Sequence, residues 1–358
     1  MNPSSSSLVR EDCRQALDGR SDLLRPLQGS SILITGGTGF IGTWLAEMLA
    51  CLNDDFGFKC RVTLAARGVD RFTSLRPHLS SRRDFRLVRV DVRYLSEVPQ
   101  DTNWLVHAAA TPDTRVHASR PIETMTTIVE GTANLIRALD PITDFRRFLY
   151  LSSGYVYGGQ PWELQAIPES FEGSFSFGFS HNAYSEAKRC AETLCAAARS
   201  EKRLPVVMAR PFAFLGPYQS LDTPWAANNF LLDALSGRPI RILGDGETVR
   251  SYMYASDLAY WLLRILTSNE SVQSWNVGSP QPVTLRDLAA LISRSVNPGV
   301  EIHLHAAAHS NVPRTRFVPD TSLAKKQLGL DLRVSLEDAV KKTIAWNLAE
   351  ASVSVAAR

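Results

Sequence analysis

The stretch Ile32-Leu33-Ile34-Thr35-Gly36-Gly37-Thr38-Gly39-Phe40-Ile41-Gly42 joins a short apolar run to a glycine-rich turn. The apolar run predicts a buried strand, and the periodicity of residues 44–50 predicts a helix directly after the turn. A strand that turns through spaced glycines into a helix can hold a pyrophosphate at the helix N-terminus. Both flanking elements are present, so the motif has the context that this mechanism requires. The alternative is a glycine-rich turn that holds no ligand.

Each glycine of the motif has its own expected role. Gly36 makes the tight turn, Gly39 lets backbone amides approach the phosphates, and Gly42 lets the helix pack closely on the strand. With Phe40 and Ile41 at the start of the helix, these glycines are the cofactor contacts expected from this segment.

The end of the second expected strand, residues 60–67, bears on the choice of cofactor. In dinucleotide-binding folds an acidic residue at this position accepts hydrogen bonds from the ribose, whereas an arginine can hold a 2′-phosphate. This chain has Ala66 followed by Arg67, and Asp70 lies past the strand end. The pattern favours NADP over NAD, with Arg71 as a possible second phosphate partner; a solvated loop arginine is the alternative.

Further strands are expected at residues 85–92, 104–110, 147–151 and 205–210, with a long helix over 122–139. Strands that alternate with helices at this spacing predict an α/β protein with a doubly wound, Rossmann-type parallel sheet. Some side chains at the strand ends have expected roles. Asp91 and Val92 are expected beside the adenine, Ala108 and Ala109 beside the dinucleotide backbone, and His107 in a structural role.

The character of the chain changes after Pro211, where prolines and glycines become frequent. Helices are expected over 228–236, 285–293 and 336–347, and strands over 240–243 and 275–277. We expect an N-terminal extension at 1–29, with a short helix within 11–24, and a dinucleotide-binding domain at 30–211. A smaller C-terminal α/β substrate-binding domain at 212–358 is expected to cover the ligand-binding mouth of the sheet, with residues 243–275 partly returning to the first domain.

Composition limits the function classes. The chain has 358 residues, 44% of them hydrophobic and 21% charged, with a formal net charge of +3, which is ordinary for a globular protein and does not indicate a nucleic-acid partner. No apolar run is long enough for a membrane span, and residues 1–10 lack a signal-peptide core. The five cysteines have no metal-ligand spacing, so we expect reduced thiols, no metal and a cytoplasmic location.

A catalytic group is indicated where the fifth strand ends in Ser152-Ser153 and a later helix opens with Tyr184 and Lys188. A tyrosine and a lysine four residues apart lie on one helical face. A free phenol has a pKa of about 10, and a nearby ammonium and a cationic nicotinamide both favour phenolate, which makes the tyrosine a usable acid or base. Ser153 is expected to hold the sugar oxygen. An inert surface pair is the alternative.

With these motifs together, the chain resembles the extended short-chain dehydrogenase/reductase family, in its nucleotide-sugar epimerase/dehydratase branch. The resemblance runs from about residue 30 to the end. It rests on Thr35 to Gly42, His107-Ala108-Ala109, Ser152-Ser153 with Val156-Tyr157-Gly158, Tyr184 with Lys188, Arg210 to Pro217, Gly244-Asp245-Gly246, Arg250 with Asp257, and Asn276-Val277-Gly278.

The resemblance implies that Tyr184 is the catalytic acid or base, that Lys188 orients it and holds the nicotinamide ribose, and that Ser153 assists. It also implies that Arg250 contacts the diphosphate of a nucleoside-diphosphate sugar, a role that suits a guanidinium. Tyr155 and Asn229 are expected on the substrate side. Family members usually form homodimers through helices that correspond here to about 120–139 and 184–199.

The chain also departs from the family pattern. Sugar 4,6-dehydratases carry an aspartate-glutamate pair where this chain has Gly154-Tyr155, and decarboxylases keep a glutamate where Tyr155 stands. Both reactions are therefore disfavoured. Ile128 and Ala213 replace asparagines that many members have.

Three functions are open at this point. The preferred one is net reduction of a 4-keto nucleotide sugar by NADPH, because residues 66–67 lack the acidic ribose ligand. The second is an epimerase that retains NAD, oxidises the sugar at C4 and returns the hydride to the other face. The third is a non-catalytic dinucleotide-binding module, against which the intact Ser153, Tyr184 and Lys188 argue.

Overall fold

The computed structural model describes residues 4–111, 113–173, 175–176, 178–296, 300–305 and 315–356. In this part of the chain a seven-stranded sheet has the order β11-β6-β5-β4-β1-β2-β3, and every pair of neighbours is parallel. The order confirms the doubly wound α/β fold. Its strands are β1 (Ser31–Thr35), β2 (Arg61–Ala66), β3 (Phe85–Arg89), β4 (Trp104–His107), β5 (Arg147–Leu151), β6 (Val206–Pro211) and β11 (Ser274–Val277).

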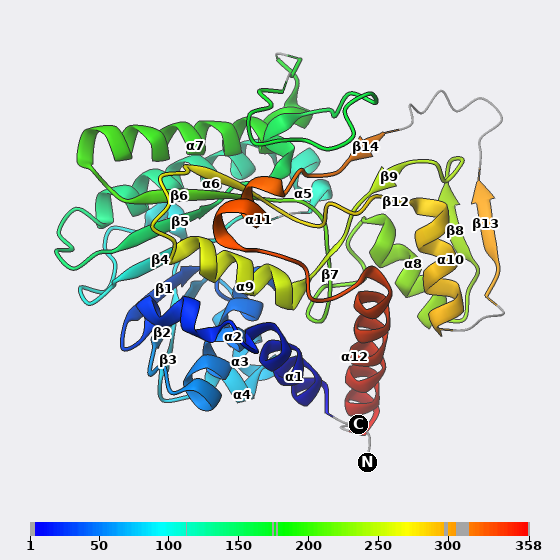
Figure 1. Cartoon of the computed structure of the whole chain (residues 1–358), viewed down its shortest axis with the longest axis horizontal. Helices are drawn as coiled ribbons and strands as arrows, with labels where there is room; N and C mark the ends of the chain where they lie inside the picture. Colours follow the sequence, from blue (N-terminus) through cyan, green and yellow to red (C-terminus); the bar gives the residue numbers. More distant parts are fainter. Residues whose placement is uncertain are drawn as a thin grey trace.

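Helices cover both faces of this sheet (Figure 1). α6 (Pro121–Ala138) and α7 (Ala183–Lys202) pack together on one face, and α2 (Phe40–Phe56) and α9 (Ala255–Leu266) pack together on the other. All five residues of β1 are buried, as expected for a central strand of a parallel sheet that is covered on both sides. Four 3₁₀ helices are described, namely η1 (Ser21–Leu27), η2 (Val92–Tyr94), η3 (Gly154–Tyr157) and η4 (Ser180–Asn182).

Two expected strands end earlier than the sequence suggested. β3 stops at Arg89 because the Asp91 side chain accepts a hydrogen bond from the Arg93 amide and starts η2. β4 stops at His107, and residues 108–110 have no regular secondary structure. Both corrections shift the expected cofactor residues from strands onto turns at the carboxyl end of the sheet.

The expected helix within residues 11–24 is also wrong in its bounds. α1 (Ser5–Leu17) ends before Gly19, which has φ +66°. That left-handed conformation favours glycine and interrupts the helix, so η1 follows as a separate turn.

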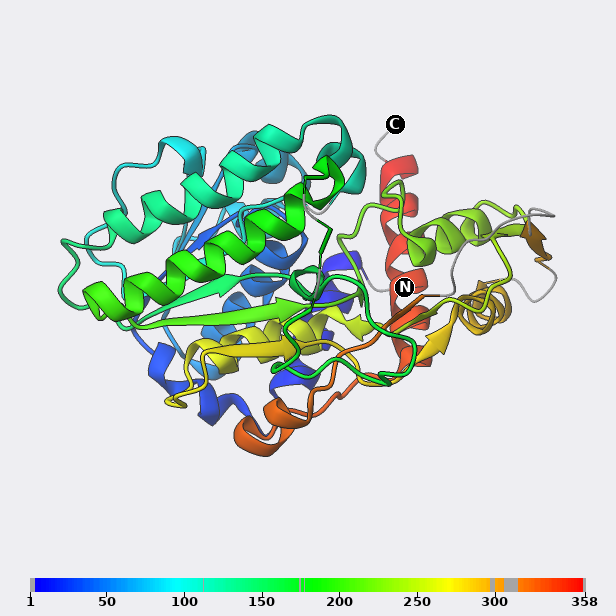
Figure 2. The same cartoon turned by 90° about the horizontal axis from the view of Figure 1, so that it is seen from above.

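The smaller part of the fold lies beyond the carboxyl ends of the strands (Figure 2). β8 (Ile240–Leu243) pairs with β13 (Ile302–His305), and α8 (Ala226–Leu235) and α10 (Leu285–Val296) pack beside them. β9 (Val249–Arg250) pairs with β12 (Val283–Thr284) and with β14 (Arg316–Phe317), and β7 (Phe214–Leu215) pairs with β10 (Met253–Tyr254). The other helices are α3 (Val69–Leu75), α4 (Pro77–Ser80), α5 (Thr114–Ser119), α11 (Ser322–Leu328) and α12 (Leu336–Ala356).

α1 contacts helices from both ends of the chain, namely α2, α9 and α12. Its Asp12 is 5% exposed and accepts hydrogen bonds from the Tyr254 hydroxyl at 2.5 Å and from the Lys342 ammonium. Burial raises the pKa of Asp12, and the two hydrogen bonds oppose that rise. In the described part of the chain, every helix is too short or too polar to cross a membrane.

Candidate active site

The turn after β1 has the close contacts that its glycines predict. Gly36 has φ +72°, and a Cβ there would lie 2.6 Å from the Ala108 carbonyl. A Cβ on Gly42 would lie 2.5 Å from the Gly36 carbonyl oxygen, so the first turn of α2 can pack on the loop only with glycine. The position of Gly39 is less crowded than those of Gly36 and Gly42, since a Cβ there would lie 3.3 Å from the nearest atom. Gly39 is the N-cap residue of α2 and offers no side chain to cap the helix.

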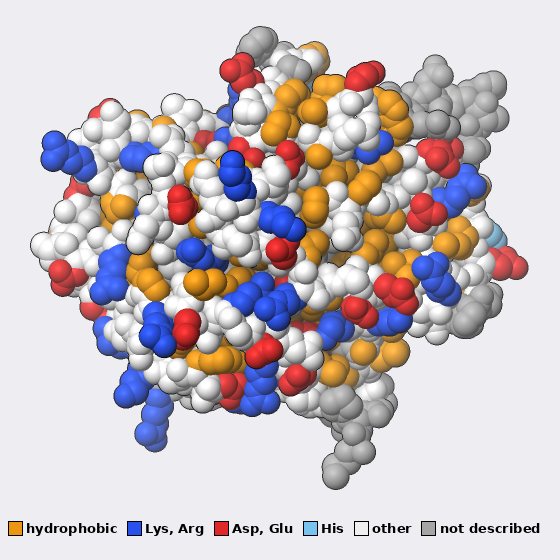
Figure 3. All heavy atoms as spheres, viewed as in Figure 1, with side chains coloured by type: hydrophobic (Ala, Val, Ile, Leu, Met, Phe, Trp, Pro, Cys, Tyr) orange, Lys and Arg blue, Asp and Glu red, His pale blue; other side chains and the backbone are white. Residues whose placement is uncertain are grey.

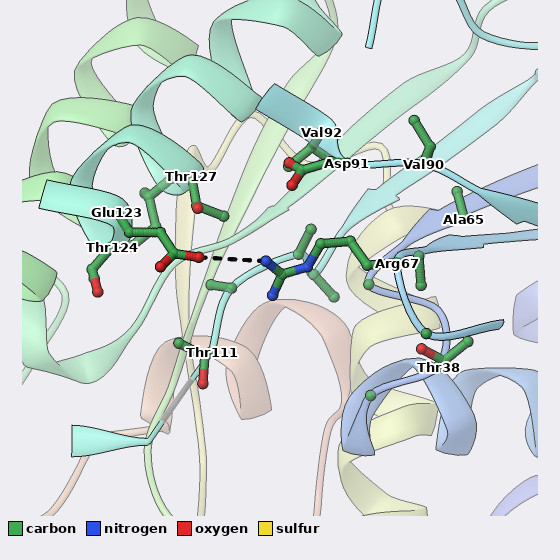
Figure 4. A pocket seen from close by; sticks show the side chains of 18 of the residues that line it. Thr38, Ala65, Arg67, Val90, Asp91, Val92, Thr111, Glu123, Thr124 and Thr127 are labelled. Atoms are coloured by element: carbon green, nitrogen blue, oxygen red, sulfur yellow. Dashed lines mark ion pairs between the residues drawn. The ribbon is translucent and has the colours of Figure 1, made fainter. Parts of the chain in front are cut away.

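A cavity of about 340 Å³ lies in front of this turn (Figure 4). Expected cofactor residues that line it are Gly36, Gly39, Arg67, Asp91, Val92, Ala108 and Ala109. Phe40, Ile41, Gly42, Tyr184 and Lys188 are not in its lining; Phe40 and Ile41 pack partly on the core instead. The cavity therefore brings together residues from the ends of β1, β2, β3 and β4, where doubly wound sheets bind dinucleotides.

Arg67 extends across this cavity from the end of β2 toward α6 (Figure 4). Its Nη1 lies 3.6 Å from Oε1 of Glu123, in the first turn of α6, and both side chains are partly exposed. The sequence reading missed Glu123, because nothing in the spacing relates the start of α6 to the end of β2. An acidic side chain thus reaches the part of the cavity at the end of β2 from a different element than the expected one.

Asp91 is held by the neighbouring Arg93, whose Nη2 donates to Oδ2 of Asp91 at 2.6 Å. This pairing lowers the pKa of Asp91, so the side chain is a carboxylate at neutral pH. It lies at the mouth of the cavity beside Val92.

Ser153, Tyr184 and Lys188 come together beyond the end of β5. The Ser153 hydroxyl lies close enough to Tyr184 to lower the pKa of its phenol. The Lys188 Nζ donates to the Leu151 carbonyl at 2.6 Å and lies 5.9 Å from the centre of the Tyr184 ring. The helix α7 supplies Tyr184 and Lys188 one turn apart, and η3 follows Ser153.

Burial dominates the electrostatics of this group in the free chain. It raises the pKa of Tyr184 to about 12, although the Ser153 hydrogen bond lowers it in part. It also lowers the pKa of Lys188 to about 7. Removing both groups from water penalises both charges, and this effect opposes the stabilisation of phenolate that a nearby ammonium gives.

His107 has the structural role expected of it. Its Nδ1 lies 2.7 Å from the Thr35 hydroxyl, and the ring is 2% exposed. Burial, with a smaller effect of Lys188, lowers the pKa of His107 to about 3, so this ring is neutral at physiological pH.

A second histidine, His117 of α5, is a residue that the sequence reading missed. Its ring stacks on the Tyr184 ring with centroids 4.3 Å apart and planes 12° apart. Its Nε2 lies 2.7 Å from the Thr111 carbonyl oxygen. No motif signals this residue, since only the packing of α5 against η4 brings it to Tyr184.

Next to Tyr184, the rings of Tyr155, Phe317 and Phe212 form what we call the aromatic wall. The Tyr155 ring stacks on Phe317 at 5.3 Å and meets the Tyr184 ring edge-on at 6.3 Å. Phe317 in turn stacks on Phe212 at 4.6 Å. Gly154 leaves room for this stack, because a Cβ there would lie 2.9 Å from both phenylalanine rings. Apolar side chains also gather over β14 and the loop after η3 on the face in Figure 3.

Arg250 lies next to this wall, since it pairs with Phe317 in the register of β9 and β14. Its guanidinium donates to the Val249 carbonyl at 2.8 Å and to the Thr315 hydroxyl at 3.0 Å. Asn229, near the start of α8, is exposed, whereas its neighbour Asn228 is buried and donates to Ser220 and Thr223.

Comparison with known proteins agrees with this geometry. The model of the NAD dependent epimerase/dehydratase family matches residues 32–278. Similar curated proteins include UDP-glucuronic acid decarboxylase 1 of Xenopus tropicalis, 31% identical over 319 residues that cover 88% of this chain and 71% of that protein. UDP-glucuronic acid decarboxylase 3 of Arabidopsis thaliana is 30% identical over 310 residues, 86% of each chain.

Solved structures share the fold at lower identity. The epimerase Mth375 of Methanothermobacter thermautotrophicus superposes with a TM-score of 0.78 at 20% identity, covering 93% of this chain and 96% of that one. UDP-glucuronic acid 4-epimerase of Bacillus cereus, in complex with NAD, has a TM-score of 0.75 at 22% identity, covering 90% and 99%. The family match over most of the length confirms the resemblance seen in the motifs: this chain belongs to the NAD dependent epimerase/dehydratase family.

Proposed function

We propose that the chain is an NAD-dependent 4-epimerase of a nucleoside-diphosphate sugar. The observation that carries this proposal is the meeting of Ser153, Tyr184 and Lys188 beyond the end of β5, the strand next to β4, together with a cavity at the glycine turn. The turn has the tight backbone packing expected of a dinucleotide-binding loop, because a Cβ on Gly36 or Gly42 would clash with the protein's own backbone. A bound nicotinamide would accept a hydride from the sugar and return it.

Each side chain of the group has a defined task in this proposal. Tyr184 removes the proton from the C4 hydroxyl and gives it back, while Ser153 holds the oxygen as the proton moves. Lys188 orients the cofactor ribose, and its charge stabilises the phenolate when a ligand draws the ammonium toward the ring. The aromatic wall packs against the sugar, and Arg250 meets the diphosphate.

Elimination and decarboxylation fit this chain less well. The family's dehydratases and decarboxylases use carboxylates at the positions of Gly154 and Tyr155. This chain has no side chain at Gly154 and a phenol at Tyr155 instead. Simple transfer of a hydride out and back requires no such carboxylate. The similarity to UDP-glucuronic acid decarboxylases supports a UDP-sugar as the substrate class.

NAD replaces NADP as the preferred cofactor. Arg67 favoured NADP in the sequence, but its partner Glu123 would face a bound 2′-phosphate with a negative charge. The family description and the NAD complex of a structural neighbour also support NAD. Reduction of a 4-keto sugar by NADPH remains the second candidate, because Arg67 is 60% exposed at the cavity.

One assay separates these functions. The purified chain is examined for bound NAD and then incubated with UDP-glucose, UDP-glucuronic acid and UDP-4-keto sugars, with and without NADPH. An epimerase carries NAD through purification and forms the C4 epimer with no net change at 340 nm. Consumption of NADPH with a keto sugar would instead establish the reductase, release of carbon dioxide would establish a decarboxylase, and no turnover would favour a binding module.

Cofactor choice has its own test in binding titrations that follow the fluorescence of NADH and NADPH. Glu123→Gln should tighten NADPH by about tenfold while NADH changes little, because the variant removes one charge near the 2′ position. Adding Arg67→Ala to the Glu123→Gln variant should abolish this increase in NADPH affinity. Equal affinities in all variants would mean that the 2′ position lies away from this ion pair.

We also propose a homodimer through the outer faces of α6 and α7. Two large apolar side chains near the start of α6 are exposed, Ile122 at 79% and Met125 at 40%, and contact with a second copy would bury them. Light scattering on the purified chain tests this; a monomeric mass at micromolar concentration would exclude it.

A further inference from the structure

The stacking of His117 on Tyr184 is the contact at the candidate active site that the proposed chemistry leaves unused. We propose that His117 is a positioning residue, which holds the plane of the Tyr184 ring and keeps water from its face. The inference rests on the proposed role of Tyr184. It concerns the ring of His117 and not a proton transfer by it.

The geometry excludes a direct hydrogen bond between the two side chains. Planes only 12° apart at 4.3 Å bring the flat faces together and point the imidazole nitrogens sideways. One nitrogen, Nε2, lies 2.7 Å from the Thr111 carbonyl oxygen. Because a carbonyl oxygen can only accept a hydrogen bond, Nε2 carries the proton. His117 is therefore fixed in orientation by the backbone that precedes α5.

The charge state of the ring agrees with a steric role. Burial lowers the pKa of His117, although the Thr111 carbonyl and Asp113 oppose this, and Lys188 lowers it further. A neutral imidazole on the phenol adds no positive charge, so stabilisation of a phenolate is left to Lys188. The ring instead covers one face of Tyr184, while Tyr155 meets the Tyr184 ring edge-on.

The position of α5 makes this arrangement responsive to the cavity. The residue before His117, Val116, lines the cavity, and the helix packs against both α6 and η4. The short helix α5 thus carries Val116, which lines the cavity, and His117, whose ring stacks on Tyr184. Misplacing a reacting group by about 1 Å can cost on the order of 10²-fold in rate, so a held phenol has a large effect.

Three substitutions separate the ring from its hydrogen bond. His117→Ala removes both, His117→Gln keeps a donor for the Thr111 carbonyl, and His117→Phe keeps a flat ring without the donor. Ser119→Ala is the matched control, because Ser119 lies on the same helix and is exposed.

The first readout needs no sugar. The tyrosine absorbance at 295 nm is titrated with alkali for each variant and for the same variant carrying Tyr184→Phe, and the difference isolates Tyr184 among the nine tyrosines. We expect Tyr184 to ionise about one pH unit lower in His117→Ala and His117→Gln, since water then reaches the phenol. His117→Phe and Ser119→Ala should titrate like the unmodified chain.

The second readout is turnover of the UDP-sugar that the assay above identifies, tested first with UDP-glucose and UDP-glucuronic acid. His117→Ala and His117→Gln should lower kcat by about tenfold to a hundredfold with KM nearly constant, and His117→Phe should restore it. Rescue by Gln but not by Phe would overturn the proposal in favour of the hydrogen bond, and an unchanged titration in His117→Ala would also overturn it. If Tyr184→Phe itself keeps full activity, the proposed function fails. The alkaline titration would still show whether the His117 ring shields Tyr184 from water.

Discussion

The turn that begins at Gly36 and the aromatic wall around Tyr155 have separate roles in the proposed reaction, and they are built in different ways. The turn is made of consecutive residues, and its shape is set by backbone atoms that approach within 2.5–2.6 Å of where a Cβ would lie. The wall joins Tyr155, Phe212 and Phe317 from three separate segments, and side chains alone make its contacts. The part that would meet the invariant pyrophosphate is thus rigid and local, and the part that would meet the variable sugar is adjustable.

Tyr184 lies where the two regions meet, and its removal should have the largest effect. Tyr184→Phe is expected to lower turnover by on the order of 10²–10⁴-fold, because the variant keeps the ring and loses the proton that moves. NADH binding and the melting temperature should remain close to those of the unmodified chain. Near-normal turnover would show that the proton is carried elsewhere, and Tyr155→Phe would then be the next variant to measure.

The turn should tolerate an added methyl group much less than the wall does. Gly42→Ala forces a Cβ against a backbone oxygen, so we expect a loss of about 1–3 kcal/mol in the free energy of unfolding and weaker NADH binding. Gly154→Ala meets only ring atoms, which can rotate, and should cost less. Urea denaturation measures both, with Gly159→Ala as the control because nothing lies within 4 Å of its Cβ position. Equal costs at both sites would remove the distinction between the two regions.

Arg250 tests whether the wall region holds the diphosphate. A hydrogen bond to a charged group contributes roughly 1.5–3 kcal/mol, so Arg250→Ala should raise KM for the nucleotide sugar by about one to two decades with a smaller change in kcat. Thr315→Val serves as a control for the anchoring bond that Arg250 makes to this hydroxyl at 3.0 Å. A lower melting temperature with constant KM would make Arg250 a structural residue.

The smallest effect is expected outside both regions, at Asp55 near the end of α2. Hydrogen bonds from Arg14 and Arg10 hold the pKa of Asp55 well below its usual range. A pKa that is lower in the folded state stabilises the fold above the unfolded pKa of about 3.9, and this contribution is lost as the pH falls through the folded pKa. Asp55→Asn should therefore cost about 0.2–1 kcal/mol at pH 7 and less at pH 2, as measured by urea denaturation. A cost that is the same at both pH values would mean that charge is not involved.

The sequence predicted the sheet, the glycine turn and the group of Ser153, Tyr184 and Lys188, because each follows from spacing within a strand or a helix. It missed Glu123 and His117, which reach the site from α6 and from α5. Their positions depend on how helices pack, and a lone acid or histidine carries no periodic signal. Strand ends were also misjudged, since the Asp91 carboxylate starts a new turn where apolar residues continue.

The contact between α1 and α12 has a consequence for biosynthesis. Asp12 and Lys342 are separated by 330 positions, which a ribosome adding about 5–20 residues per second covers in roughly 15–70 s. During that interval the emerging α1 can settle on α2, but its buried acid has no ammonium to balance it. A ribosome stalled before α12 would release a chain in which Asp12 lacks the Lys342 ammonium and α1 lacks its contact with α12, and chaperones and proteases act on such incompletely folded chains.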